Sequence, residues 1–183
     1  MSNEQESGTA KLTLPVSQQD HRRGAETAPV TLLEYGDYEC PDCGQVYPIV
    51  KEIRRRLGDR LLFVFRNFPL TQIHPHAEHA AEAAEAAAAQ EKFWEMHDYL
   101  FEHQDALDDT HLAQYAIDLN LDLPRFEQDF DDPAIIEHIR EDVLSGIQSG
   151  VNGTPTFFIN GVRHDGSFDL DTMLAAIEDA AAS

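Results

Sequence analysis

VTLLEYGDYECPDC, residues 30–43, is the stretch that decides the fold. Its first half, Val30–Tyr35, is largely apolar and β-favouring and is followed by a glycine, so we expect a buried strand. Its second half carries Cys40 and Cys43 at the beginning of a helical stretch that runs to about Leu57. A CxxC pair where a strand passes into a helix is typical of a redox site in a βαβ unit.

The segments that follow predict the rest of a small sheet. Leu61–Phe68 is a second apolar strand, so the order strand, helix, strand indicates a parallel pair with a right-handed crossover. Strand signals return only at Thr156–Ile159 and Val162–His164, and Asn160-Gly161 between them is the strongest short hairpin signal. A last helix is expected over Asp169–Ala182, with its first residue as N-cap.

Between these halves, every element that we expect is helical. One long helix is predicted over Ala77–His103, and shorter ones near Thr110–Leu119, with the threonine as N-cap, and Leu123–Asp129. Another is predicted over Pro133–Ser149, with Asp132 as N-cap. Without this middle the order is β-α-β, then β-β-α, which is the order of the thioredoxin fold. The sequence therefore predicts an α/β thioredoxin-like fold with a helical subdomain inserted between its halves.

The chain divides accordingly into three parts. Residues 26–73 and 150–183 form the predicted thioredoxin-fold domain, and residues 74–149 form the inserted helical subdomain. Residues 1–25 are rich in Ser, Glu, Gln, Gly and Thr, which predicts a mobile segment, with a candidate edge strand at Leu12–Leu14.

Composition excludes some classes of partner. The 183 residues include 13 Lys+Arg and 34 Asp+Glu, a net charge of −21, which disfavours binding to nucleic acid or to an anionic membrane surface. No apolar run reaches the roughly 20 residues of a membrane-spanning helix. Residues 1–10 lack the basic and apolar regions of a signal peptide, so the expected location is cytoplasmic. An acidic chain with few lysines fits a high-salt cytoplasm, although an ordinary acidic cytosolic protein is the alternative.

The two cysteines are expected to play different parts. Cys40 sits at the N-terminus of a helix, where free N–H groups and the helix dipole stabilise a thiolate, so it is the predicted exposed nucleophile. Cys43 follows one helical turn later, which brings its sulfur back beneath the first, and it is the predicted shielded, resolving thiol. Pro41 suits the first turn of a helix, where its missing N–H has little effect.

Other uses of the pair stay open at this point. A structural zinc site needs about four ligands, and His74, His76 and His79 could complete one with the two cysteines. A non-catalytic peptide-binding module, or two buried and inert thiols, are the further alternatives. The sequence contains no Gly-rich phosphate loop and no basic patch.

Two residues near the pair are candidates for a supporting role. Glu34 lies close to the end of an apolar strand, where burial raises the pKa of a carboxyl group, and it could accept the proton of Cys43. A carboxylate turned to solvent at the strand end is equally compatible with the pattern. Pro155, after Thr154, precedes the third strand; X–Pro bonds can be cis, but a trans turn proline has the higher base rate.

Two stretches resemble the DsbA-like thiol–disulfide oxidoreductases, which are thioredoxin-fold proteins with an inserted helical domain. They are LEYGDYECPDC at residues 33–43 and GVNGTPTFFING at residues 150–161. HPHA at residues 74–77 and KFW at residues 92–94 also resemble that family, so the likeness covers roughly residues 12–180.

The resemblance implies a role for each site residue. Cys40 is the nucleophile, Cys43 the resolving cysteine and Glu34 the buried acid. Pro155 is the cis-proline facing the dithiol, and Thr154 lends its backbone to a bound substrate strand. The resemblance also implies no metal and no cofactor beyond the Cys40–Cys43 disulfide. The implied partners are protein or peptide thiols and disulfides, together with a redox recycling partner.

The chain departs from the strongly oxidising, secreted members of that family in two ways. They have a signal peptide, and they carry His where this chain has Asp42. An anion beside a developing thiolate is expected to raise the pKa of Cys40. Pro41 and Asp42 are therefore the predicted tuning residues, and we expect a potential toward the reducing part of the range of about −270 to −120 mV.

Overall fold

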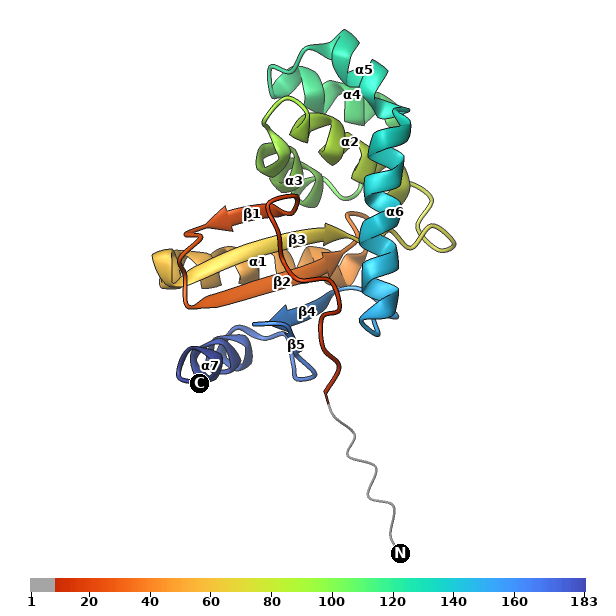
Figure 1. The fold of residues 1–183 in the computed structure, drawn as a ribbon. Helices are drawn as coiled ribbons and strands as arrows, with labels where there is room; N and C mark the ends of the chain where they lie inside the picture. The colour runs from red at the N-terminus through yellow and green to blue at the C-terminus, as the bar shows by residue number, and fades with distance from the viewer. Residues whose placement is uncertain (1–8) are drawn as a thin grey trace, which may run out of the picture.

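The computed structural model of the protein describes residues 9–183. Within this range a five-stranded sheet has the order β1-β3-β2-β4-β5 (Figure 1). β2 is parallel to β3, and the other three pairings are antiparallel. The strands are β1 (His21–Gly24), β2 (Val30–Gly36), β3 (Leu61–Asn67), β4 (Thr156–Ile159) and β5 (Val162–Arg163).

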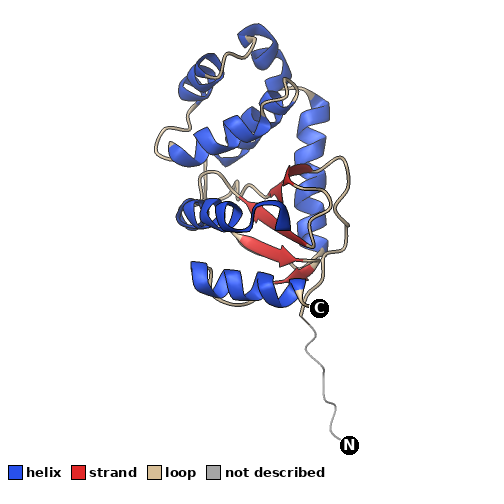
Figure 2. Ribbon diagram, turned by 90° about the vertical axis from the view of Figure 1, so that its left-hand side faces the viewer, coloured by secondary structure: helices blue, strands red, loops and turns tan. Residues whose placement is uncertain are grey.

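Helices cover both faces of the sheet. In the two views, α1 and α7 lie on one face, α6 runs along the other, and the remaining helices gather beyond one edge (Figures 1 and 2). The helices are α1 (Pro41–Leu57), α2 (Ala77–Ala88), α3 (Phe93–Glu102), α4 (Asp109–Asp118), α5 (Leu123–Phe130), α6 (Pro133–Gln148) and α7 (Leu170–Ala181), with a short 3₁₀ turn η1 (Gly58–Arg60). None of these helices combines the length and the apolar character needed to cross a membrane.

The strand pattern explains the layers. Successive side chains of a strand point to opposite faces, and β2 and β3 are apolar at nearly every position because both of their faces are covered. Leu32 and Phe63 pack with the side chains of α1 and α7. Leu33 and Val64 pack in a second cluster on the α6 side. The predicted order, β-α-β followed by β-β-α with helices in between, is confirmed.

The edge strand lies at a different place from the one predicted. Leu12–Leu14 is not a strand, although Lys11 forms an isolated bridge with Val162. The edge strand is instead β1, within the segment expected to be mobile, and it pairs with β3. Tertiary contact explains the difference: the His21 ring stacks on Phe93 with 3.6 Å between ring centroids. Residues 1–8 of that segment lie outside the described part of the chain.

The long helix predicted over residues 77–103 is two helices. α2 ends at Ala88 and α3 begins at Phe93, with Glu91 between them at a φ of 64°. A non-glycine residue in this conformation ends a helix. The break lets α3 fold back against α2, which brings both alanine-rich and aromatic faces into the core.

Helix starts follow the acidic caps in the sequence. Asp132 accepts from the backbone N–H of Ala134, and Asp169 accepts from that of Thr172, as predicted N-caps do. The prediction for Thr110 is wrong, because α4 already begins at Asp109 after Asp108. The Asn160-Gly161 hairpin between β4 and β5 is confirmed, with φ values of 47° and 81° that suit these two residues.

Candidate active site at the cysteine pair

The beginning of α1 positions the two cysteines. Cys40 is the N-cap residue and Pro41 is the first helical residue, so free N–H groups of the first turn surround the Cys40 sulfur. Both cysteines are free thiols. Cys40 is only 5% exposed and Cys43 is fully buried. As expected, Cys40 is more exposed than Cys43. Cys40, the predicted nucleophile, is nevertheless far less exposed to solvent than the sequence suggested, because other segments pack over it.

The loop before β4 is one of those segments. The Cys40 Sγ donates to the backbone oxygen of Thr154 across 3.6 Å. The Thr154–Pro155 peptide bond is cis. Antiparallel pairing of β4 with β2 brings this loop to the end of the sheet where α1 begins. Sequence-distant residues that were predicted to form one site are therefore adjacent.

The pKa of Cys40 is lowered to about 5. The main cause is a hydrogen bond from the Cys43 thiol; burial opposes it, and hydrogen bonding from Thr154 and from the backbone N–H groups of Cys43 and Asp42 lowers the pKa further. Asp42 contributes to this lowering through its backbone N–H. The expectation that its charge raises the pKa of Cys40 stays a prediction. Burial and hydrogen bonding to Cys40 raise the pKa of Cys43 strongly.

Glu34 is buried in the sheet behind this pair. Its side chain is 2% exposed, and its Oε1 has no hydrogen-bond partner within residues 9–183. Burial, followed by the negative charge of Cys40, raises the pKa of Glu34 to about 8. The alternative of a strand-end carboxylate turned to solvent is therefore wrong. A carboxyl group with this pKa can either hold or release a proton near neutral pH.

Asp37 organises the loop between β2 and α1. Its carboxylate is buried and accepts hydrogen bonds from the backbone N–H groups of Glu39 and Leu70, at 2.8 and 2.9 Å, and from His74 Nδ1 at 2.7 Å. Burial lowers the pKa of His74, but the hydrogen bond and charge of Asp37, together with the charge of Cys40, raise it overall. The surroundings thus favour the protonated form of His74, a role that its sequence position did not reveal.

Gln104 is a second residue that sequence reasoning missed. Its Nε2 donates to the backbone oxygens of Tyr38 and Cys40, both at 2.9 Å, and so fixes the turn that carries the nucleophile. A Cβ on Gly44 would lie 1.9 Å from Gln104 Oε1, so this glycine makes room for the contact. Gln104 lies 64 residues from Cys40, and no local pattern points to it.

A shallow hollow opens beside the pair. Its apolar lining comes from Val46 and Ile49 of α1, Pro155 and Phe168, and its polar lining from Asp42, Gln45, Thr154, Ser167 and Asp169. The hollow holds about 430 Å³. A hollow with apolar and polar walls next to a backbone segment suits an extended peptide.

The histidines considered as partners of the cysteines do not gather around them. His79 Nδ1 pairs with Asp109 at 2.6 Å, and His74 pairs with Asp37. Within residues 9–183, no group of three or more metal-ligating atoms includes either cysteine. The geometry therefore gives no support to a zinc site built on the cysteine pair.

Comparison with known proteins adds a family to this geometry. The family model described as thioredoxin matches residues 16–179. The structure is similar to that of oxidised BdbD from Bacillus subtilis, with a TM-score of 0.82 and 23% identity over 96% of this chain and 98% of that one. It is also similar to alpha-DsbA1 from Wolbachia pipientis, with a TM-score of 0.81 and 26% identity over 93% and 94%.

Curated relatives carry a different name. The Na(+)/H(+) antiporter NhaA 3 of Salinispora tropica is 48% identical over 179 residues, which are 96% of this chain and 27% of the relative. The NhaA 1 antiporter of Salinispora arenicola is 48% identical over 174 residues, which are 94% and 26%. The chain thus spans about a quarter of the length of these relatives.

Proposed function

We propose that the chain exchanges disulfides with protein thiols through a mixed disulfide at Cys40. The premise is that the chain belongs to the thioredoxin family and has the DsbA-like fold. The observation that carries the proposal is the contrast within one CxxC pair. Cys40 has its pKa lowered to about 5, whereas the pKa of Cys43 is raised and its sulfur is shielded. Only one of the two thiols is therefore ready to attack or to leave at neutral pH.

The exchange proceeds in two substitutions at sulfur. A substrate thiolate attacks the Cys40 sulfur of the Cys40–Cys43 disulfide, the S–S bond breaks, and Cys43 leaves. A second substrate thiolate then attacks the substrate sulfur of the mixed disulfide, and Cys40 leaves as a thiolate. The substrate loses two electrons and the cysteine pair gains them. The same steps in reverse reduce a substrate disulfide, and no cofactor takes part.

Glu34 is the proposed carrier of the proton of Cys43. When Cys43 leaves the disulfide it is a strongly basic thiolate in a buried place, and the protonated Glu34 can neutralise it. In the reverse direction, the Glu34 carboxylate accepts the proton of Cys43 as that thiol attacks the mixed disulfide. The pKa of about 8 allows both roles near neutral pH.

The hollow beside Pro155 defines the class of substrate. Val46, Ile49 and Phe168 offer apolar contact, and the backbone of Thr154 is the proposed hydrogen-bonding edge for an extended segment. Backbone pairing does not read side chains, so broad acceptance of protein and peptide thiols is expected. A redox partner that recycles the pair is part of this proposal.

Trapping experiments test the proposal. With a disulfide-containing model protein or peptide, the Cys40 thiolate of Cys43→Ser should attack the substrate disulfide, release one substrate sulfur as a thiolate and accumulate as a mixed disulfide, whereas Cys40→Ser should lose all exchange. Mass spectrometry of the trapped species assigns the attacked sulfur. A Cys40→Ser variant that retains exchange would overturn the proposal. A peptide-binding module without catalysis would instead bind the peptide equally well in the wild type and in both variants.

A further inference from the structure

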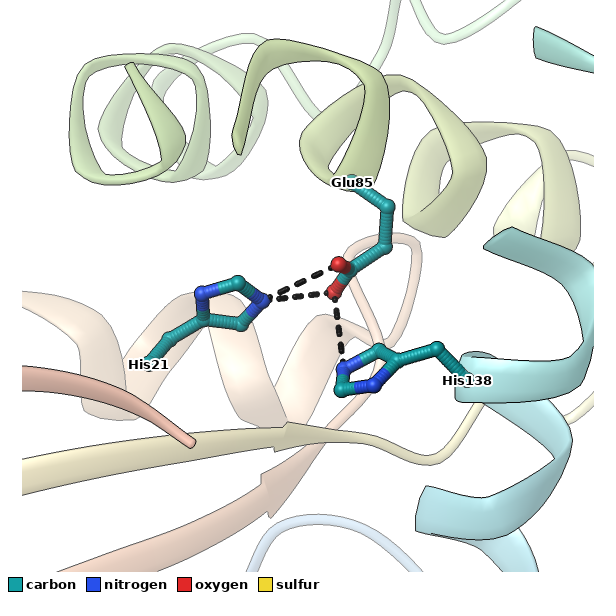
Figure 3. Close-up of side chains that lie close together, drawn as sticks. All are labelled: His21, Glu85 and His138. Carbon is teal, nitrogen blue, oxygen red and sulfur yellow. Dashed lines mark hydrogen bonds and ion pairs between the residues drawn. The ribbon is translucent and has the colours of Figure 1, made fainter. Parts of the chain in front are cut away.

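Three metal-ligating side chains from three elements converge where the sheet meets the helical insertion. His21 comes from β1, Glu85 from α2 and His138 from α6, and their ligand atoms all lie within 4.8 Å of one another. Figure 3 shows the His21 ring beside the Glu85 carboxylate and the His138 ring below it, with a nitrogen of each directed at the carboxylate. In the sheet, His21 of β1 lies opposite Phe65 of β3, and Phe65 lies opposite Glu34 of β2. Strand β3 therefore lies between this cluster and the strand that carries Glu34.

The spacing of the three side chains is close to that of a metal site. His21 Nε2 lies 2.8 and 3.0 Å from the two oxygens of Glu85, and His138 Nε2 lies 3.6 Å from Glu85 Oε1. Ligands about 2.0–2.2 Å from a tetrahedral ion are separated from each other by about 3.3–3.6 Å. A small rotation of the side chains therefore suffices to place one ion between the three groups.

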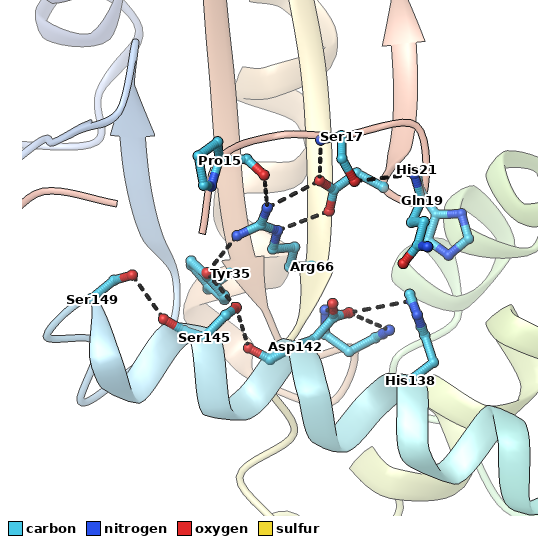
Figure 4. A network of polar contacts seen from close by, with 12 residues as sticks. Pro15, Ser17, Gln19, His21, Tyr35, Arg66, His138, Asp142, Ser145 and Ser149 are labelled. Atoms are coloured by element: carbon cyan, nitrogen blue, oxygen red, sulfur yellow. Dashed lines mark hydrogen bonds and ion pairs between the residues drawn. The ribbon is translucent and has the colours of Figure 1, made fainter. Parts of the chain in front are cut away.

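The site is held by its surroundings. The His21 ring stacks on Phe93 at 3.6 Å between centroids, which fixes its orientation. Asn67 Nδ2 donates to Glu85 Oε1 at 2.8 Å and to Asp142 Oδ2 at 3.2 Å. Figure 4 shows Asp142 one helical turn from His138, and its Oδ2 lies 3.7 Å from His138 Nε2. Such outer partners orient metal ligands in proteins.

The local charge favours a cation. The charges of Glu85 and Asp20 both act on Asp142, and the guanidinium of Arg66 is already paired with Asp20. Glu85 is buried with 7% of its side chain exposed, whereas His138 is 28% exposed and gives an ion a way in from solvent. A buried negative charge beside two imidazoles is a setting that a divalent ion would stabilise.

We propose that His21, Glu85 and His138 bind one divalent ion of the late first-row transition series, with Zn²⁺ as the ion that best fits two imidazoles and one carboxylate. Ca²⁺ and Mg²⁺ prefer sites made of oxygen ligands, so they fit poorly here. Asp142 already accepts two hydrogen bonds from Asn67, one from the Asn67 backbone N–H at 3.0 Å and one from the Asn67 side-chain amide at 3.2 Å. It serves as an outer partner, which leaves a fourth coordination position to water.

Binding requires that both imidazoles present a lone pair. A metal ion and a proton compete for these lone pairs, so binding weakens as the pH falls. The bound ion joins the edge strand β1 to α2 and α6. It therefore ties the edge of the sheet to the helical insertion, and its effect is expected on stability rather than on the cysteine chemistry.

The test measures binding without the cysteines, which also bind zinc. In a Cys40→Ser/Cys43→Ser background without a histidine tag, calorimetric titration with Zn²⁺ should show one site, and Co²⁺ should give visible ligand-field absorption. His21→Gln and His138→Gln should each weaken Zn²⁺ binding at least tenfold and should abolish the rise in melting temperature that Zn²⁺ produces. His138 is near the surface, so circular dichroism should show its variant to be folded.

A matched control separates this site from general histidine binding. His79 also faces a carboxylate, that of Asp109 at 2.6 Å, but lies outside the cluster. His79→Gln should bind Zn²⁺ as tightly as the background protein does. Three outcomes would overturn the proposal: no Zn²⁺ binding, unchanged binding in His138→Gln, or equally tight binding of Ca²⁺. Because both cysteines are replaced, none of these outcomes depends on the proposed exchange activity.

Discussion

Cys40 and Thr154 lie 114 residues apart, yet the Cys40 sulfur is 3.6 Å from the Thr154 backbone oxygen. The Thr154 hydroxyl is buried and has no partner of its own within residues 9–183. When Cys40 is a thiol, it donates to the carbonyl; when it is a thiolate, it needs donors instead. The Thr154 hydroxyl is free to become one of them, in line with the lowering effect of Thr154 on the pKa of Cys40.

The first prediction concerns this hydroxyl. Thr154→Val should raise the pKa of Cys40 above about 5, because the thiolate loses a donor while the side-chain shape is kept. Thr154→Ser keeps the hydroxyl and should leave the pKa near the wild-type value. The rate of iodoacetamide alkylation against pH gives the pKa in each case. Equal values for the Val and Ser variants would show that only the backbone of Thr154 acts on the sulfur.

The second prediction concerns the reduction potential. The sequence predicts a reducing protein because of Asp42, but the pKa of Cys40 is lowered to about 5. A thiolate that is stable at neutral pH stabilises the reduced pair and makes the disulfide more oxidising. We therefore expect a potential above that of thioredoxin, which is about −270 mV. Equilibration with glutathione, read by thiol labelling, measures it; a value at or below the thioredoxin value would support the expectation from Asp42.

The third prediction follows from the pKa of about 8 for Glu34. In the unfolded chain this carboxyl group has its ordinary pKa of 4.5. Between these two pH values the unfolded state binds fewer protons than the folded state, so the group reduces stability as pH rises through the window. Glu34→Gln should therefore increase the free energy of unfolding at pH 8 by at least about 1 kcal/mol, with little difference at pH 4.

Urea unfolding of the two proteins at both pH values checks this. The same variant should slow the resolution of a mixed disulfide by about 10²-fold, because it can neither give nor take the Cys43 proton. If the free energy of unfolding at pH 8 is no larger for the Glu34→Gln variant than for the wild type, the carboxyl group of Glu34 is not desolvated.

Much of the fold could be predicted because local patterns carry it. Val30–Tyr35 and the Asn160-Gly161 hairpin are decided by neighbouring residues, and so is the position of the cysteines at the start of α1. The edge strand β1 could not be predicted, because HRRG has no β pattern and pairs only where β3 offers a free edge. The break at Glu91 likewise depends on packing of α3 against α2.

The site shows the same division. Cys40 and Cys43 could be named from their spacing at one strand end, whereas the pattern left Glu34 either buried or turned to solvent, and only the family resemblance implied that it is the buried acid. Gln104 and the His21–Glu85–His138 cluster could not, since their members come from segments far apart in sequence and carry no motif. The size of the Cys40 pKa shift could not be predicted for a related reason. It depends on which donors face the sulfur, and a sequence shows the charge of Asp42 but not the direction of a hydrogen bond.

The fourth prediction uses the contact between Gly44 and Gln104. Gln104→Ala leaves the backbone oxygens of Tyr38 and Cys40 without this donor and should lower the free energy of unfolding by about 1–3 kcal/mol. Gly44→Ala should lower it as well, because its new methyl group displaces the Gln104 amide. In a double-mutant cycle, Gly44→Ala should be less harmful when Gln104 is already Ala, since the same hydrogen bonds are lost only once. Strict additivity would show that the glycine is needed for another reason.

The fifth prediction concerns Arg66, which is buried at 1% exposure. Its guanidinium donates to both oxygens of Asp20 at 2.8 and 3.0 Å and to the Tyr35 hydroxyl at 2.9 Å, in the network of Figure 4. Asp20→Asn keeps the shape of the side chain but leaves a buried positive charge without a counter-ion. Removing one partner of a buried pair lowers the free energy of unfolding by about 3–5 kcal/mol.

Replacing both partners separates the pair from the rest of the network. Arg66→Met with Asp20→Leu removes both charges and should recover a large part of the stability that Asp20→Asn loses, since apolar residues of similar size can substitute for a buried ion pair. Urea unfolding at neutral pH compares the three proteins. If the double variant is as unstable as Asp20→Asn, the hydrogen bonds from the guanidinium to Tyr35 and to the backbone oxygen of Pro15 at 3.3 Å, and not the charge pair, hold the N-terminal segment against the sheet.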